Sequence, residues 1–181
     1  ATVKKGVKEM QLLSAKPVLY ICNVNESEAG KGNDWTAQIA EKAKGENAET
    51  VVISANIEQE IAQLEDPEEK VMFLEEIGLE TPGLERVIKA GYDLLDLITF
   101  FTTGPKETRA WTVRKGAKAP EAAGRIHTDF EKGFIRAETI AYDDFIELGG
   151  EAAAREAGKL RAEGKDYLVQ DGDIMLFRFN L

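Results

Sequence analysis

Two short polar segments, each placed directly after an apolar run, carry side chains that could bind a ligand. Residues 23–26 have the sequence NVNE and follow the run 18–22, and residues 54–56 have the sequence SAN and follow the run 51–53. Ligands of open α/β sheets bind beyond the carboxyl ends of the strands, so we expect the two segments to line one site. The candidate residues of this site are Asn23, Val24, Glu26, Ser54, Ala55 and Asn56.

The elements that position this site are predicted from apolar patterning. Residues 18–22 form a continuous apolar run, which is typical of a strand buried on both faces of a parallel sheet. A polar loop follows as far as Asp34, which we expect to cap a helix over Trp35–Lys44, and Glu49–Ser54 is predicted as a second strand. Strand, helix and strand of this size form a βαβ unit. A solvated loop after a strand is the alternative interpretation of residues 23–26.

Helical patterning continues after the second strand. Ile57, Ile61 and Leu64 share one face of a predicted helix. Residues 66–69 (DPEE) predict a helix start, because proline suits the first turn and acids suit the positive end of the helix dipole. A further helix is predicted over Leu84–Asp93.

From residue 97 onward the pattern changes to a mixture of short strands and helices. Strands over residues 97–103 and 107–113 predict a hairpin around the turn 102–105. The other predicted elements are a helix over Ala119–His127, short strands over Phe134–Ala137 and Tyr167–Val169, a surface helix over Ala152–Arg161, and a last strand over Ile174–Phe179. This order fits a small α+β roll of the β-grasp type, and we expect a domain boundary near residues 91–97.

The predicted hairpin carries a concentration of positive charge. Five basic side chains fall within thirteen residues and are opposed only by Glu107. Alternate residues share one face of a strand, so Arg109 and Trp111 would lie together, where they could contact RNA phosphates and stack on a base. The alternative is a solvated hairpin with Trp111 in the core. The candidate residues for RNA or ribosome binding are Lys106, Arg109, Trp111, Arg114, Lys115 and Lys118.

Composition excludes several kinds of site. His127 is the only histidine, so this chain cannot assemble a His-based metal site or a Ser-His-Asp triad, and we expect His127 to cap a helix end or bond the following loop. Cys22 is the only cysteine, and as a buried thiol it fits a reducing compartment. No apolar stretch approaches the roughly 20 residues of a membrane span, and we expect a cytoplasmic location.

The net charge of −10 is concentrated in one part of the chain. Residues 56–86 contain ten acidic and two basic side chains. Overall acidity repels nucleic acid at long range, although it allows a local basic patch. We therefore expect neither a DNA partner nor a membrane partner.

Several motifs together are similar to one known family. The NxxE pattern of Asn23 and Glu26 takes the place of the N-K-x-D motif with which P-loop GTPases bind guanine, and Ser54-Ala55 takes the place of their S-A motif. Further similar runs are residues 76–79, 82–84, 90–95, 99–107, 125–134 and 171–174. Over nearly its whole length the chain resembles the carboxy-terminal part of the YchF/Obg-like P-loop ATPases.

This resemblance implies a fold class, a nucleotide and a partner. The fold class would be α/β: a partial parallel-sheet P-loop nucleotide-binding domain over residues 1–95, ending a helical insertion at residues 1–12, followed by an α+β β-grasp TGS domain over residues 96–181. ATP is the implied nucleotide, because the longer carboxylate of Glu26 is misplaced for the two donors of guanine. The implied partner is the ribosome or ribosomal RNA. Mg²⁺ is expected in the full-length family, with no ligands in this chain.

The phosphate-binding motif of that family, G-x-x-x-x-G-K-[ST], is missing from the sequence. Gly-Lys pairs begin at residues 30, 158 and 164, but none has the required earlier glycine or a following Ser or Thr. No D-x-x-G switch motif precedes Asn23 either. We expect no catalytic residue and no ATP hydrolysis by this chain alone, which leaves its status as an enzyme open. The alternatives are an RNA- or ribosome-binding TGS module without nucleotide chemistry, and a structural remnant without independent activity.

Overall fold

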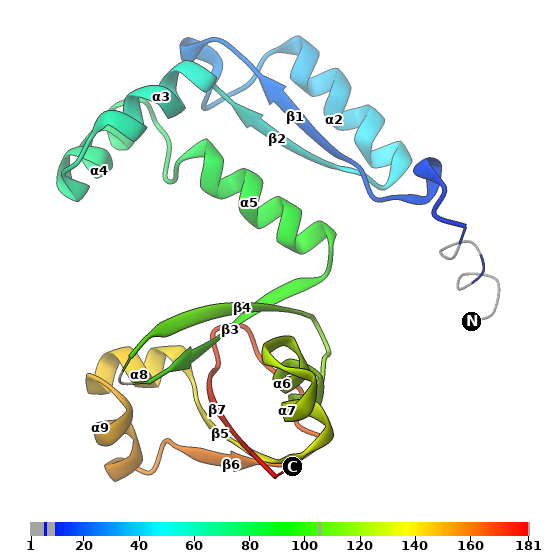
Figure 1. Cartoon of the computed structure of the whole chain (residues 1–181). Coiled ribbons are helices and arrows are strands. Elements are labelled where there is room, and N and C mark those ends of the chain that lie inside the picture. The colour runs from blue at the N-terminus through cyan, green and yellow to red at the C-terminus, as the bar shows by residue number, and fades with distance from the viewer. Residues whose placement is uncertain (1–5, 7–9, 105, 181) are drawn as a thin grey trace. The chain divides into compact units, whose positions relative to one another are not determined.

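The computed structural model describes residues 6, 10–104 and 106–180, and the chain divides into two compact units, Ala1–Leu95 and Asp96–Leu181 (Figure 1). The predicted helical segment at residues 1–12 falls largely on residues outside that described part. No helix in these described ranges is long and apolar enough to cross a bilayer.

The first unit is built on a two-stranded parallel sheet followed by helices. Its elements are η1 (Leu13–Ala15), β1 (Leu19–Asn23), η2 (Glu26–Glu28), α2 (Asp34–Glu46), β2 (Glu49–Ile53), α3 (Ala55–Gln63), α4 (Pro67–Glu76) and α5 (Gly83–Leu94). β1, α2 and β2 form the predicted βαβ unit. Asn23 is paired with Ile53, so both strands end at the same edge of the sheet.

Strand β1 is less buried than its apolar sequence predicts. Ile21 is 49% exposed and Val18 before the strand is 43% exposed. Cys22 is half-buried, so the prediction of a buried thiol is also wrong. A continuous apolar run indicates a strand that has cover on both faces, but burial depends on neighbours, and the described sheet contains only β1 and β2.

Two helix starts in this unit are set by side-chain caps. Asn33, and not Asp34, is the N-cap of α2: its Oδ1 accepts hydrogen bonds from the N–H groups of Trp35 and Thr36, both at 3.0 Å. An N-cap must lie one residue before the helix, with extended backbone, which places Asp34 inside the first turn. Helix α4 starts at Pro67, as residues 66–69 predict, and Asp66 is its N-cap, with Oδ1 2.9 Å from the Glu68 nitrogen.

The second unit is a five-stranded mixed sheet with two pairs of helices. Its elements are β3 (Leu97–Thr103), β4 (Thr108–Arg114), α6 (Ala119–Ile126), α7 (Thr128–Lys132), β5 (Phe134–Ile140), α8 (Tyr142–Leu148), α9 (Glu151–Glu156), β6 (Arg161–Glu163) and β7 (Ile174–Phe179). The strand order is β4-β3-β7-β5-β6, in which only the β3–β7 pair is parallel. Figure 1 shows this sheet curling around α6 and α7.

The core of the second unit lies between the sheet and α6. Phe100 and Met175 are almost fully buried there, against Ala122 and Ala123, which have no exposed surface. Alanines on the buried face of α6 let the helix approach the strands closely, so large side chains of the sheet fill the space. This packing fixes the direction in which each strand residue points.

Two predictions for the last third of the chain are wrong. Residues 167–169 form no strand, and their only ladder contact is a single bridge between Leu168 and Lys118. The predicted helix over residues 152–161 stops at Glu156, and Arg161–Glu163 is instead the edge strand β6 paired with β5. The pattern of alternating charges and alanines favours a helix locally, but Gly158 has a positive φ of 72° and ends it.

Candidate functional site

The ends of β1 and β2 are joined by a side-chain hydrogen bond. The Oδ1 atom of Asn23, the last residue of β1, accepts a hydrogen bond from the backbone N–H of Ala55 at 2.9 Å. The backbone N–H of Val24 also donates to the carbonyl oxygen of Ile53 at 2.9 Å. Because the strands are parallel and in register, the loops that leave them therefore begin side by side.

A second contact joins the same loops further out. The Nδ2 atom of Asn56 donates to Oε1 of Glu26 at 3.2 Å, across thirty residues of sequence. Glu26 and Asn56 are exposed, whereas Ser54 is 3% exposed and is the N-cap residue of α3. The structure thus brings together Asn23, Ala55, Glu26 and Asn56, with Ser54 buried beneath them.

A polar pocket of about 260 Å³ lies beyond these strand ends. Its walls are formed by Asn23, Val24, Asn25, Glu28, Asn33, Ala55 and Asn56. Asn25, Glu28 and Asn33 were not anticipated from the sequence, although the Asn33 cap and its hydrogen bond to Glu28 (Nδ2 to Oε2, 3.1 Å) fold the loop back over the strand end. Glu26 and Ser54 adjoin this pocket through Asn56 and Ala55 and are not among its walls.

The walls of this pocket are mostly polar and contain one carboxylate, that of Glu28. The carboxamides of the walls can donate and accept hydrogen bonds, and the Glu28 carboxylate can accept them, at the polar edge of a ligand such as a purine ring. In the part of the chain that the structure describes, no group of three or more His, Cys, Asp or Glu side chains could hold a metal ion. The residues of the walls do not fit a magnesium ion, and their chemistry suits a polar organic ligand.

The basic hairpin places an arginine on a tryptophan. The Arg109 guanidinium lies 4.2 Å from the centre of the Trp111 ring, and Trp111 Nε1 donates to Thr102 Oγ1 at 2.9 Å. The two side chains share a face, which confirms the predicted alternation. Trp111 is half-buried and packs against the core, so it has a structural role as well as its contact with Arg109.

The other cations of the hairpin are exposed, and Lys118 forms an ion pair with an acidic side chain. Lys118 Nζ lies 2.6 Å from Oδ1 of Asp166, which raises the pKa of Lys118 and lowers that of Asp166. Lys106, Arg114 and Lys115 lie at the surface.

His127 has the structural role that the sequence predicts. It ends α6 and caps α7, and its Nδ1 accepts a hydrogen bond from the Asp129 N–H at 3.2 Å. The capping hydrogen bond explains the position of the His127 side chain, and no acid–base function is needed to explain it.

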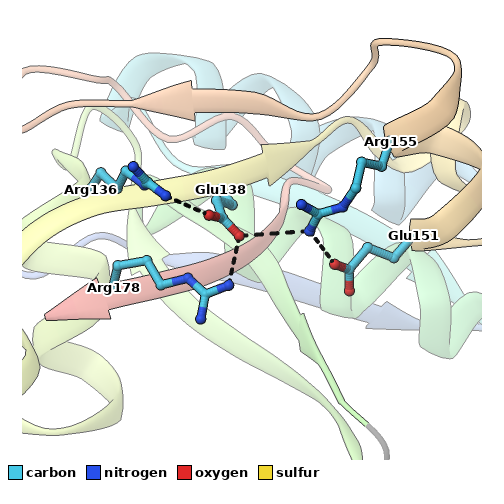
Figure 2. Close-up of polar contacts among 5 residues, drawn as sticks. All are labelled: Arg136, Glu138, Glu151, Arg155 and Arg178. Carbon is cyan, nitrogen blue, oxygen red and sulfur yellow. Dashed lines mark hydrogen bonds and ion pairs between the residues drawn. The ribbon is translucent and has the colours of Figure 1, made fainter.

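A network that the sequence did not suggest surrounds Glu138 on β5. Figure 2 shows its carboxylate facing Arg136, Arg178 and Arg155, with Glu151 behind Arg155. Glu138 is 8% exposed, and its pKa is held below the ordinary value, first by the hydrogen bond from Arg178 and then, against the effect of burial, by Arg136. Alternation along β5 predicts that Arg136 and Glu138 share a face of the strand. The contact with Arg178 of β7 depends on the pairing of two distant strands, so it could not be predicted from the sequence.

A second network lies within the loop before β7, around the buried side chain of Asp173. Tyr167 donates its hydroxyl to Oδ2 of Asp173 at 2.7 Å, and the Gln170 N–H donates to the same oxygen at 2.9 Å. Burial raises the pKa of Tyr167 to about 12, and burial also raises the pKa of Asp173. Arg161 of β6 lies beside both groups.

Residues 97–180 match the model of a family described as "YchF-GTPase_C: Protein of unknown function (DUF933)". The chain is 58% identical over 180 residues to the protein named ribosome-binding ATPase YchF of Bacillus subtilis. The aligned segment covers 98% of this chain and 49% of that protein. It is 48% identical over 170 residues to Obg-like ATPase 1 of Gallus gallus, and this alignment covers 92% of this chain and 42% of that protein. The chain spans about half the length of the curated relatives it matches.

A solved structure shares the fold of the chain. It is titled as the Schizosaccharomyces pombe YchF GTPase and superposes with a TM-score of 0.79 at 35% identity, covering 95% of this chain and 46% of that one. The α/β architecture with a mixed sheet is therefore the one found in that protein.

Proposed function

We propose, from the premise that this chain belongs to the YchF/Obg-like family, that its first unit is the base-binding part of an ATPase and its second unit a ribosome-binding TGS domain. The observation that carries the first half of this proposal is the hydrogen bond from the Ala55 N–H to Asn23 Oδ1. This hydrogen bond holds the ends of β1 and β2 next to each other. A base-binding site needs donors and acceptors that are held in fixed positions in this way.

The proposed ligand of that site is the adenine of ATP. Guanine presents two adjacent donors to a short carboxylate in the GTPase motif, and the longer Glu26 side chain, held by Asn56, is displaced from that arrangement. A polar site discriminates strongly when a donor of the ligand is left unpaired. The relatives are named both ATPase and GTPase, so base preference is a property that needs measurement.

The phosphates and Mg²⁺ of the nucleotide would be held by parts of the longer protein. Mg²⁺ supplies charge neutralisation when phosphoryl groups are transferred. The role proposed for Asn23, Glu26 and Asn56 is to bind and select the base, and that for Val24, Ser54 and Ala55 is to shape the wall around it.

The test is a chimera in which this chain replaces the matching segment of the Bacillus subtilis relative. Competition binding with labelled nucleotide should give tighter binding of ATP than of GTP, and Glu26→Asp should shift the ratio toward GTP by about tenfold, the equivalent of one hydrogen bond. Glu41→Asp, on the exposed surface of α2, is the matched control and should leave the ratio unchanged. Equal ATP/GTP ratios in the wild type and Glu26→Asp would refute the base assignment.

A second function, RNA or ribosome binding by the second unit, is favoured by the stacked Arg109–Trp111 pair. Stacking on an accessible ring and contact with phosphate are how proteins bind single-stranded RNA segments. The chain would use this surface whether or not the nucleotide site is complete.

Co-sedimentation with ribosomes tests this function in the chain itself. Arg109→Glu should weaken co-sedimentation more than Lys165→Glu, which makes the same charge change at an exposed position of the same unit. Rising salt should weaken the wild type as well. If both variants behave alike, the hairpin is ordinary surface.

A further inference from the structure

The second unit has another cationic surface, on the face of its sheet opposite the core. Arg136 on β5 pairs in register with Arg178 on β7, and the next pair along, Ala137 with Phe177, belongs to the core beside α6. Because successive residues of a strand point to opposite faces, the two arginines lie on the face away from that core. Glu138 lies on this outer face too, and Arg155 of α9 reaches it from outside the sheet (Figure 2).

The three arginines are organised by a single carboxylate. Arg178 Nη2 lies 3.0 Å from Glu138 Oε2, and Arg136 Nη2 lies 3.1 Å from Glu138 Oε1. Arg155 Nη2 lies 3.8 Å from Glu138 Oε2 and 2.9 Å from Glu151 Oε1. Glu138 is 8% exposed, whereas about half of each arginine side chain is exposed. The acid is thus beneath the surface and the guanidinium groups are at it.

The arrangement leaves hydrogen-bonding capacity pointing to solvent. A guanidinium carries five N–H donors, and within residues 6, 10–104 and 106–180 each of the three contacts its carboxylates through Nη2 alone. Among the residues that the structure describes, these three positive groups are paired with two negative ones, Glu138 and Glu151, so the cluster retains a net positive charge. Planar guanidinium groups that have free N–H donors and a positive charge are well suited to bind phosphate oxygens.

We propose that Arg136, Arg155 and Arg178 bind the phosphate backbone of RNA, and that Glu138 is the positioning residue that holds their guanidinium groups in place. The proposal rests on the ribosome-binding function proposed above, and it adds a second surface to the one at Arg109 and Trp111. RNA is favoured over a single anion because the Arg136 and Arg155 guanidinium groups lie on opposite sides of Glu138 (Figure 2), so that separate phosphates can contact them. Contacts of this kind position the RNA without reading its sequence.

The positioning role of Glu138 predicts a change in RNA affinity opposite in direction to the change expected from charge alone. Removing an acid from a basic surface raises its attraction for RNA if charge alone matters. If Glu138 positions the arginines, Glu138→Gln instead lowers the affinity, because three guanidinium groups that repel one another are no longer held together. The sign of the change therefore separates the two interpretations.

The experiment is fluorescence anisotropy of the full chain with a labelled RNA duplex of unrelated sequence, over a range of salt concentrations. Arg136→Gln and Arg178→Gln should each lower the affinity roughly threefold to tenfold and reduce the salt slope by about one. Lys165→Gln, which removes an exposed cation outside the cluster, is the matched control. Affinities equal to that of the control would overturn the site.

Two further variants keep the positioning role testable if Glu138→Gln does not fold, which circular dichroism will show. Arg136→Lys and Arg178→Lys retain the charge and lose the fork, so they should bind RNA more weakly than the wild type. Affinity that is unchanged in the lysine variants, or raised in a folded Glu138→Gln, overturns the positioning role. Competition by a phosphoserine peptide at lower concentration than by unlabelled RNA would overturn the choice of RNA.

Failure of this inference and failure of the ribosome proposal give different results. If the cluster variants bind the duplex normally while Arg109→Glu still weakens ribosome co-sedimentation, only the second surface is wrong. If the wild type does not co-sediment with ribosomes but its duplex binding depends on the cluster, the ribosome proposal is wrong and the RNA surface stands.

Discussion

The Glu58 carboxylate of α3 caps the first residue of another helix, Gly83 of α5. Oε1 accepts a hydrogen bond from the Gly83 N–H at 2.6 Å, and Oε2 accepts one from the Leu84 N–H at 3.0 Å. Pro82, the N-cap residue of α5, has no side-chain hydrogen bond to offer. A carboxylate from a distant helix therefore satisfies two free backbone donors and lies at the positive end of the α5 dipole.

Glu58→Ala should destabilise the first unit through the start of α5. Loss of a helix cap costs about 1–2 kcal/mol, so the free energy of unfolding should fall by that amount, and amides in the first turn of α5 should exchange faster. Urea unfolding and hydrogen-exchange mass spectrometry measure the two effects. Glu60→Ala, at an exposed position of the same helix, should change neither, and equal effects of both variants would argue against the cap.

Gly83→Ala should also destabilise the first unit, for a steric reason. A Cβ at this position would lie 2.6 Å from Glu58 Oε1 and 2.9 Å from Cγ2 of Ile53, so the cap or the strand end must move. Gly91 of the same helix has open space around it, and Gly91→Ala should raise the free energy of unfolding by about 0.5–1 kcal/mol. Opposite shifts in melting temperature are expected, and a stabilising Gly83→Ala would contradict the packing described.

Thr139→Val should stabilise the second unit. Thr139 has no exposed surface, and its Oγ1 finds no hydrogen-bond partner among the described residues. A buried polar atom without a partner costs about 1–3 kcal/mol, and valine has the same shape. Thr102→Val is the matched opposite, because it removes the acceptor of the Trp111 Nε1 donor and should lower stability. Denaturant midpoints that move the same way in both variants would refute this explanation.

Tyr167 should give the second unit a distinctive loss of stability in alkali. Its pKa is raised from 10.0 to about 12 by burial and then by the Asp173 carboxylate. Between these two values the folded chain keeps a proton that the unfolded chain has lost, so stability is fully present below pH 10 and falls as pH rises toward 12.

Tyr167→Phe should remove this contribution, so its free energy of unfolding should decline less steeply than that of the wild type across the same window. Ultraviolet titration of the folded protein should lose its component with a midpoint near 12, and Tyr142→Phe should retain it. A wild type whose four tyrosines all titrate near pH 10 would contradict the hydrogen bond to Asp173.

The elements that local patterning determines were predictable from the sequence. Residues 97–103 form the predicted strand with the same bounds, and its first residues alternate between half-buried and buried positions. The start of α4 at Asp66 and Pro67 follows from capping and from the fixed φ of proline. In both cases the physical cause lies within a few residues of the element itself.

The features that depend on distant neighbours were not predictable. Arg161–Glu163 has the composition of a helix and is a strand only because β5 lies beside it. The same holds at the candidate sites: the NVNE and SAN segments indicated which residues meet at the strand ends, but Asn33 joins the pocket through a loop closure. Likewise, Arg155 reaches Glu138 only after α9 has packed against the sheet.

The pairing of β1 on one side only has a consequence for its amide protons. The carbonyl of Val18 and the N–H of Val24 both bond to β2, so the even-numbered residues of β1 direct their backbone groups toward that strand. The amides of Ile21 and Asn23 then face the other way, toward the side of β1 that has no partner strand among the described residues. Slow and fast exchange should alternate residue by residue along this strand, and a neighbouring strand laid along that side would slow the fast set while leaving the slow set unchanged.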